Sequence, residues 1–169
     1  APTGIALALA DIEEILQHNP EQLVVIDEAY VDFGAESAVP LLDKYDNLLV
    51  VQTLSKSRSL AGARVGLAIS NKEIIEDLNR IKFSFNPYNL NRLSILAGTE
   101  ALKDVEYFND TRTWIIKTRA TFVAQMEALG FTVLPSKANF VFATHPDMAG
   151  QTYFEKLRER QIIVRHFKD

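Results

Sequence analysis

Three short apolar runs constrain the fold of this chain more than any other feature. Residues 23–26, 48–51 and 65–69 are each too short for a typical helix, and the first two are rich in β-branched side chains. Such runs are typical of strands that are buried on both faces of a sheet. Helical patterns separate the runs, and this alternation predicts an α/β fold with a mainly parallel sheet in a three-layer αβα arrangement.

Helical spacing of apolar side chains defines the segments between the strands. Ile12, Ile15 and Leu16 share one face of the first such segment, which Asn19-Pro20 ends. Asn71 is expected to cap the next helix, and Gly130 to close the longest one. We expect helices over residues 9–18, 71–81, 89–102 and 104–129, with an aromatic loop over residues 83–89.

The pattern changes after residue 130, where short strands and one helix follow. The expected strands are residues 131–134, 140–143 and 162–164, and the expected helix is residues 148–159. We therefore expect three parts: part of a larger α/β domain over residues 1–103, a long bridging helix over residues 104–130, and the start of a smaller α+β domain over residues 131–169.

Composition excludes several classes of function. Eighteen Lys and Arg residues against 22 Asp and Glu residues give a net charge of −4, so we expect no nucleic-acid partner. No apolar run approaches the roughly 20 residues that span a bilayer, so we expect no membrane association. The chain has no cysteine, which fits a cytoplasmic protein. Its opening, Ala1-Pro2-Thr3-Gly4, is typical of a mid-chain turn, and we expect a fragment of a longer protein.

Ionisable side chains follow the first two predicted strands. Asp27 and Tyr30 come directly after the first strand, and Lys56 comes after the second. Ligands of open α/β sheets bind beyond the carboxyl ends of the strands, so we expect these side chains to meet in one cleft.

This set matches the chemical needs of pyridoxal phosphate (PLP). That cofactor requires a lysine amine for its aldehyde and an acidic partner for its ring nitrogen. Lys56 is the candidate amine, Asp27 the candidate acid, and Tyr30 a candidate donor to the phenolic oxygen. After the substrate has displaced it, Lys56 would move a proton as general base and then acid.

The residues around Lys56 offer donors for a phosphate group. Arg64 presents a planar guanidinium that suits two phosphate oxygens, and Thr53 and Ser55 add hydroxyl groups.

Each of these candidate site residues also has a non-catalytic interpretation. A lone Ser-Lys-Ser sequence is usually a solvated loop, and Asp27 with Glu28 could be a strand end or an acidic pair that binds a metal. No glycine-rich loop with Gly-Lys-Ser or Gly-Lys-Thr accompanies that pair, which weakens a nucleotide-hydrolase interpretation. The three histidines, His18, His145 and His166, are scattered, so we expect no metal site.

Three segments carry a resemblance to a known family. Residues 27–30, 53–57 and 60–66 resemble the fold-type I PLP-dependent aminotransferases of the aspartate aminotransferase superfamily. Within it the resemblance is closest to the histidinol-phosphate aminotransferase family, and residues 1–4, 135–141 and 162–167 also resemble segments of that family.

The resemblance implies a function for the parent of this chain. Members of that family transfer an amino group between L-histidinol phosphate and 2-oxoglutarate in histidine biosynthesis, and they form homodimers. It implies that Lys56 binds PLP, that Asp27, Tyr30, Ser55 and Arg64 contact it, and that Arg165 meets the substrate phosphate. Residues 1–103 would then be the C-terminal part of the PLP-binding large domain. The fragment alone is expected to be inactive and to expose apolar surface of its sheet.

Other members of the same subgroup share these motifs. A threonine-phosphate decarboxylase or an aromatic aminotransferase remains an alternative. So does a transcription regulator whose aminotransferase-like domain senses PLP.

Overall fold

The computed structural model describes residues 1–167 and contains two separate sheets. The strands are β1 (Val24–Asp27), β2 (Leu48–Thr53), β3 (Gly66–Ile69), β4 (Thr132–Val133) and β5 (Ala143–Thr144). The helices are α1 (Leu9–His18), α2 (Lys72–Phe85), α3 (Arg92–Lys103), α4 (Val105–Ala128) and α5 (Gly150–Glu159). Three short 3₁₀ helices complete the elements: η1 (Val31–Phe33), η2 (Val39–Asp43) and η3 (Ala61–Ala63). The predicted mixed α/β class is confirmed.

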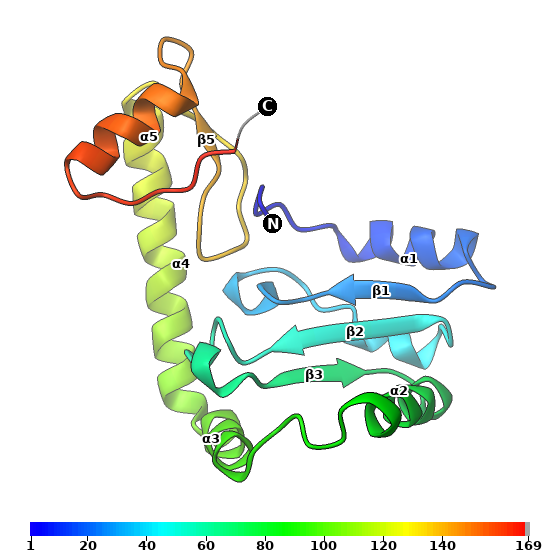
Figure 1. Cartoon of the computed structure of the whole chain (residues 1–169). Coiled ribbons are helices and arrows are strands. Elements are labelled where there is room, and N and C mark those ends of the chain that lie inside the picture. Colours follow the sequence, from blue (N-terminus) through cyan, green and yellow to red (C-terminus); the bar gives the residue numbers. More distant parts are fainter. Residues whose placement is uncertain (168–169) are drawn as a thin grey trace.

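The larger sheet has the order β1-β2-β3 and is only partly parallel. β1 and β2 run parallel, and their carboxyl ends point toward α4, whereas β3 runs antiparallel to β2 and points away (Figure 1). The expectation of a mainly parallel sheet is therefore wrong for β3. The chain returns from β2 to β3 through a loop that holds only η3, and such a loop carries no crossover helix of the kind that a parallel neighbour needs.

One face of this sheet forms the hydrophobic core. α1 and η2 pack against it, and β2 contributes Leu48 and Val50, both fully buried. The core residues are Ile12, Leu16, Ala38, Leu41, Leu48 and Val50, with Val24, Ile26 and Ile69 packed at their edge. Because side chains alternate between the two faces of a strand, Leu48 and Val50 point into this core, whereas Leu49 between them is buried on the opposite face.

The opposite face is less well covered near β1. Val25 is 53% exposed, whereas its neighbour Leu49 on β2 is 6% exposed. The prediction that residues 23–26 are buried on both faces is therefore wrong, because among the described residues β1 pairs with β2 alone and lies at the sheet edge. This exposure agrees with the expected uncovered apolar surface.

Polar side chains begin three of the helices. The side chains of Asn71, Asn91 and Asp104 each accept a hydrogen bond from a backbone N–H in the first turn of α2, α3 and α4. α2 extends to Phe85, beyond the expected end, and so includes the start of the expected aromatic loop. None of the helices in the described part of the chain is long and apolar enough to cross a bilayer.

The C-terminal part contains less strand than the sequence indicates. β4 and β5 form a two-stranded antiparallel sheet near the end of α4, and residues 162–164 form no strand. Those residues follow α5 and find no strand partner among residues 1–167, which is why their β-branched composition does not give a strand.

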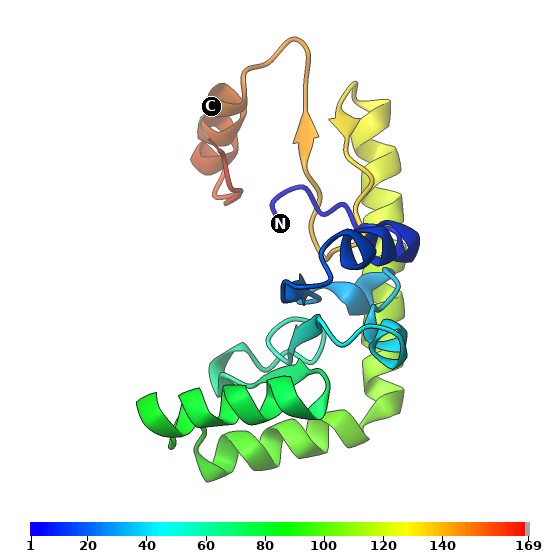
Figure 2. The same ribbon diagram turned by 90° about the vertical axis from the view of Figure 1, so that its right-hand side faces the viewer.

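Backbone oxygens accept hydrogen bonds that join this part to the rest of the chain. The Arg119 guanidinium on α4 donates to the backbone oxygens of Phe33 (2.9 Å) and Ala138 (2.6 Å). The Lys137 N–H donates to the Gly4 oxygen at 2.7 Å, which places the N-terminal residues beside the C-terminal part (Figure 2). Partial burial lowers the pKa of the Arg119 guanidinium, which stays protonated at neutral pH.

Candidate active site

Asp27 is the last residue of β1 and is exposed to solvent. Its Oδ1 accepts a hydrogen bond from the Ala29 N–H at 2.9 Å, and this contact turns the chain away from the sheet. Asp27 pairs in register with Val51 on β2, at the carboxyl end of β1, and this end of the strand points toward α4 (Figure 1).

Tyr30 lies between the two parts of the chain. Its ring packs edge-on against Phe140, with centroids 5.2 Å apart and an angle of 86° between the planes. The Lys56 Nζ lies 5.3 Å from the centroid of the same ring, within the range of a cation–π contact. Tyr30 therefore brings the predicted amine and the C-terminal part of the chain to one place.

Lys56 belongs to an ordered loop that follows β2. The Ser55 N–H donates to Thr53 Oγ1 at 3.1 Å, and the Thr53 hydroxyl donates to Ser55 Oγ at 2.9 Å. The Leu60 N–H donates to the Leu54 oxygen at 3.0 Å and closes the loop at its base. Lys56 itself is exposed, while Leu54 and Ser57 on either side of it are buried. The loop is thus anchored by buried residues on both sides of Lys56, while Lys56 itself is exposed to solvent.

Arg64 lies at the far end of the same loop. The Leu54 N–H donates to the Val65 oxygen at 3.1 Å, which brings Arg64 near the residues that lead to Lys56. Arg64 has a left-handed backbone, with φ at 58°, and its Nη1 donates to the Ala61 oxygen at 3.1 Å. Arg64 is exposed, and it comes two residues before Gly66, which pairs with Thr53 at the end of β2.

Glu28 has a structural role that the sequence did not reveal. Its buried carboxylate accepts hydrogen bonds from Ser37 Oγ (2.8 Å), the Ala38 N–H (2.5 Å) and Gln52 Nε2 (2.8 Å). The carboxylate is therefore occupied by donors and is not available to a cation. No cluster of three or more potential metal ligands is found within residues 1–167, so the acidic-pair interpretation gains no support.

A cavity of about 920 Å³ lies beside Tyr30. The N-terminal residues, the turn after β1 and the C-terminal part all contribute to its wall, and Arg165 lies on that wall with Tyr30 and Phe140. Arg165 thus shares a cavity with Tyr30, although the two residues come from distant segments. Lys56 does not line this cavity; its contact with the cavity runs through the Tyr30 ring.

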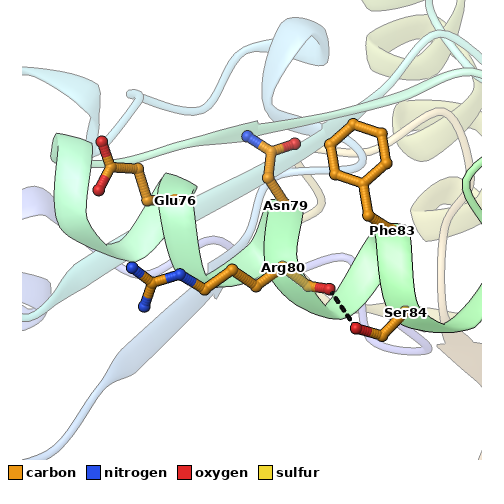
Figure 3. A pocket seen from close by; sticks show the side chains of 5 residues that line it. All are labelled: Glu76, Asn79, Arg80, Phe83 and Ser84. Carbon is orange, nitrogen blue, oxygen red and sulfur yellow. Dashed lines mark hydrogen bonds between the residues drawn. The ribbon is translucent and has the colours of Figure 1, made fainter.

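A second, smaller pocket of about 440 Å³ lies on α2 (Figure 3). Its wall consists of side chains from successive turns of that single helix: Glu76, Asn79, Arg80, Phe83 and Ser84. None of the predicted site residues belongs to it, so it is not the candidate site.

Comparison with known proteins identifies the family. The sequence pattern of the family described as aminotransferase class I and II matches residues 1–169. The chain belongs to this aminotransferase family.

Relatives and solved structures agree with this assignment. This aminotransferase chain is 59% identical over 167 residues to histidinol-phosphate aminotransferase 2 of Rhizobium meliloti, covering 99% of the chain and 48% of the relative. A crystal structure of the histidinol-phosphate aminotransferase from Clostridium acetobutylicum matches with a TM-score of 0.88 at 28% identity, over 97% of this chain and 51% of that one. The chain spans about half the length of the curated relatives it matches.

A further structure is informative about the cofactor. The histidinol-phosphate aminotransferase from Sinorhizobium meliloti was solved in complex with pyridoxal-5'-phosphate. It matches with a TM-score of 0.84 at 26% identity, over 96% of this chain and 45% of that chain.

Proposed function

We propose that the protein to which this chain belongs transfers an amino group between L-histidinol phosphate and 2-oxoglutarate, with PLP as cofactor. The observation that carries the proposal is the position of the Lys56 amine 5.3 Å from the Tyr30 ring, at the carboxyl ends of two adjacent strands. The names of relatives that are 52–59% identical to the chain support the substrate.

The side chains at this end of the sheet have the chemistry that PLP requires. Lys56 would hold the cofactor through its amine, Asp27 would pair with the ring nitrogen, and the Tyr30 hydroxyl would donate to the phenolic oxygen. Within residues 1–167 the Lys56 amine makes no salt bridge, so no fixed carboxylate competes for it.

The proposed phosphate contacts come from both ends of the lysine loop, before and after Lys56. Arg64 uses one guanidinium nitrogen on the Ala61 oxygen, and its exposed group has further N–H donors for a phosphate. The Thr53 and Ser55 hydroxyls lie 2.9 Å apart and would add donors beside it.

When bound, PLP supplies an electron-withdrawing ring that stabilises negative charge on the substrate carbon. The chain would supply the proton transfer. Lys56 Nζ would accept the proton from the substrate carbon as a general base. It would then donate that proton to the cofactor carbon as a general acid. The Asp27 carboxylate would keep the ring nitrogen protonated through its negative charge.

Arg165 would bind the substrate phosphate, because a guanidinium forms paired hydrogen bonds with phosphate oxygens. Its place on the wall of the 920 Å³ cavity, together with Tyr30, supports this role. The aromatic side chains of that wall would pack against the imidazole ring of the substrate.

We also propose a homodimer that acts on small molecules in the cytoplasm, without nucleic acid or membrane. Large apolar side chains around the α2–α3 connection support a partner surface: Phe85 is 90%, Tyr88 92% and Leu93 76% exposed. The absence of cysteine supports the location. The division into a large-domain part (residues 1–103), a bridging helix (104–130) and a partial small domain (131–169) also stays a proposal.

The test uses the complete product of the gene that encodes this chain. Borohydride reduction with bound PLP should label Lys56, and Lys56→Ala should abolish both the label and amino transfer. Lys72→Ala is the matched control, because that side chain is 87% exposed on α2. A label on another lysine would contradict the site assignment.

The substrate is tested with the same protein. Amino transfer from histidinol phosphate should exceed transfer from phenylalanine, and Arg165→Ala should raise the KM for histidinol phosphate at least tenfold, which corresponds to roughly 1.4 kcal/mol. Arg160→Ala, at the exposed end of α5, should leave the KM unchanged. Preference for phenylalanine would refute the substrate, and a monomer in light scattering would refute the dimer.

A further inference from the structure

Ser57 and Asp32 form a contact that neither the resemblance nor the proposed mechanism uses. The Ser57 hydroxyl donates to Asp32 Oδ2, although the two residues lie 25 positions apart. Ser57 is 8% exposed and directly follows Lys56, while Asp32 lies in η1, two residues after Tyr30. The hydrogen bond therefore joins the neighbours of the two side chains that meet at the candidate site.

This contact lies past the last paired residues of β1 and β2. The last paired residues of β1 and β2 are Asp27 and Val51, and the Glu28 N–H donates once more to the Val51 oxygen at 2.8 Å. β1 ends there, whereas β2 stays paired with β3 through Thr53 before it leaves the sheet. Gln52 Nε2 donates to Glu28 Oε2 just past this point, and farther out the Ser57–Asp32 hydrogen bond joins the loop after β2 to η1.

The other side of the lysine loop is held by Arg58. Its guanidinium lies 3.5 Å from the centroid of the Phe108 ring on α4, and its Nη1 donates to the Ala101 oxygen at 2.7 Å. Two consecutive residues after Lys56 are thus bound to different elements. Arg58 fixes the loop against α3 and α4, whereas Ser57 fixes it by a hydrogen bond to the turn that carries Tyr30.

We propose that Ser57 and Asp32 are a positioning pair that sets the place of the Lys56 amine relative to the Tyr30 phenol. The inference rests on the proposed function, in which both groups contact PLP. With the pair intact, the phenol donates to the cofactor's phenolic oxygen while the amine is held at its aldehyde. Without the pair, the two turns separate and the phenol no longer reaches that oxygen.

A purely structural hydrogen bond predicts a different result. Loss of such a bond lowers the thermal midpoint but leaves the spectrum of bound PLP unchanged. A positioning pair also changes that spectrum, because a donor at the phenolic oxygen favours the deprotonated form of the bound cofactor and keeps the pH midpoint of its visible absorbance low.

The experiment compares variants of the complete gene product: Ser57→Ala, Asp32→Ala, the double variant and Ser57→Thr, which keeps a hydroxyl. Ser59→Ala is the matched control, because Ser59 lies in the same loop, is exposed, and its side chain forms no hydrogen bond within residues 1–167. Apoprotein is titrated with PLP by fluorescence, and the absorbance of bound PLP is followed against pH.

We expect each single alanine variant to weaken PLP binding by about tenfold and to raise the absorbance midpoint by about half a pH unit. The double variant should be no worse than either single variant, since both remove the same interaction. Ser57→Thr should restore the midpoint, and Ser59→Ala should match the wild type.

Two results would overturn the inference. Additive losses in the double variant would show that the residues act separately, and an unchanged midpoint in folded Ser57→Ala and Asp32→Ala would show a structural role alone. Failure of the wild-type protein to bind PLP would instead refute the proposed function, so the two failures are distinguishable.

Discussion

Gly4→Ala should loosen the contact between the N-terminal residues and the C-terminal part of the chain. Gly4 has a φ of +77°, in the left-handed region that side chains disfavour, and a Cβ added there would lie 2.5 Å from Ser136 Oγ. Ser136 has little freedom to move aside. Its hydroxyl donates to the Phe140 oxygen at 2.6 Å and accepts from the Ala138 N–H at 3.0 Å.

The expected magnitude follows from these two costs. Left-handed backbone costs a residue with a Cβ about 1–2 kcal/mol, and displacing the Ser136 hydroxyl weakens two hydrogen bonds worth about 1 kcal/mol each. The sum is about 3 kcal/mol of local opening free energy. Because about 1.4 kcal/mol is a factor of ten, the protection of nearby amides should fall about a hundredfold.

Hydrogen exchange at the Lys137 amide is the direct assay, because this N–H donates to the Gly4 oxygen. Gly62→Ala is the matched control: a Cβ there meets nothing within 4 Å, so protection should stay within about threefold of wild type. Ser136→Ala in the Gly4→Ala background should add little further loss, because the clash already displaces the hydroxyl that this substitution removes. Equal protection in Gly4→Ala and Gly62→Ala would refute the reasoning.

Two further predictions concern the helix α4 and pH. Arg119→Met should lower the urea midpoint by an amount equivalent to about 2 kcal/mol, because it leaves the oxygens of two buried residues without their donor; an unchanged midpoint would contradict this. Hydrogen bonds from Tyr45, and then Lys44, hold the pKa of Glu13 below its ordinary 4.5, so its contribution to stability is present above that pH and lost as the pH falls. Glu13→Gln should therefore show a shallower loss of stability than wild type between about pH 5 and pH 3, measured by urea unfolding at each pH.

The positions of the candidate site residues along the chain were predictable because strand ends are local features. Asp27 lies at the end of β1, and Lys56 lies in the loop after β2, as the apolar runs indicated. The Asn71 cap and the α4 end near Gly130 were also predictable, since both depend on residues within one helical turn.

Features that depend on distant partners were not predictable. The direction of β3 depends on how the chain returns to β2, and the absence of a strand at residues 162–164 depends on the lack of a neighbouring strand within residues 1–167. Glu28 and Ser57 were visible in the sequence, but their partners lie 9–25 positions away, and nothing in a local pattern pairs them.

The antiparallel pairing of β2 with β3 has a consequence for how this protein can vary. Thr53 and Gly66 face each other across the ladder, so the segment that carries Lys56 leaves and re-enters the sheet at the same place. Its length and sequence can therefore change without shifting the register of either strand. Evolution or design can therefore remodel the loop around Lys56 as a unit, while β2 and β3 keep their pairing.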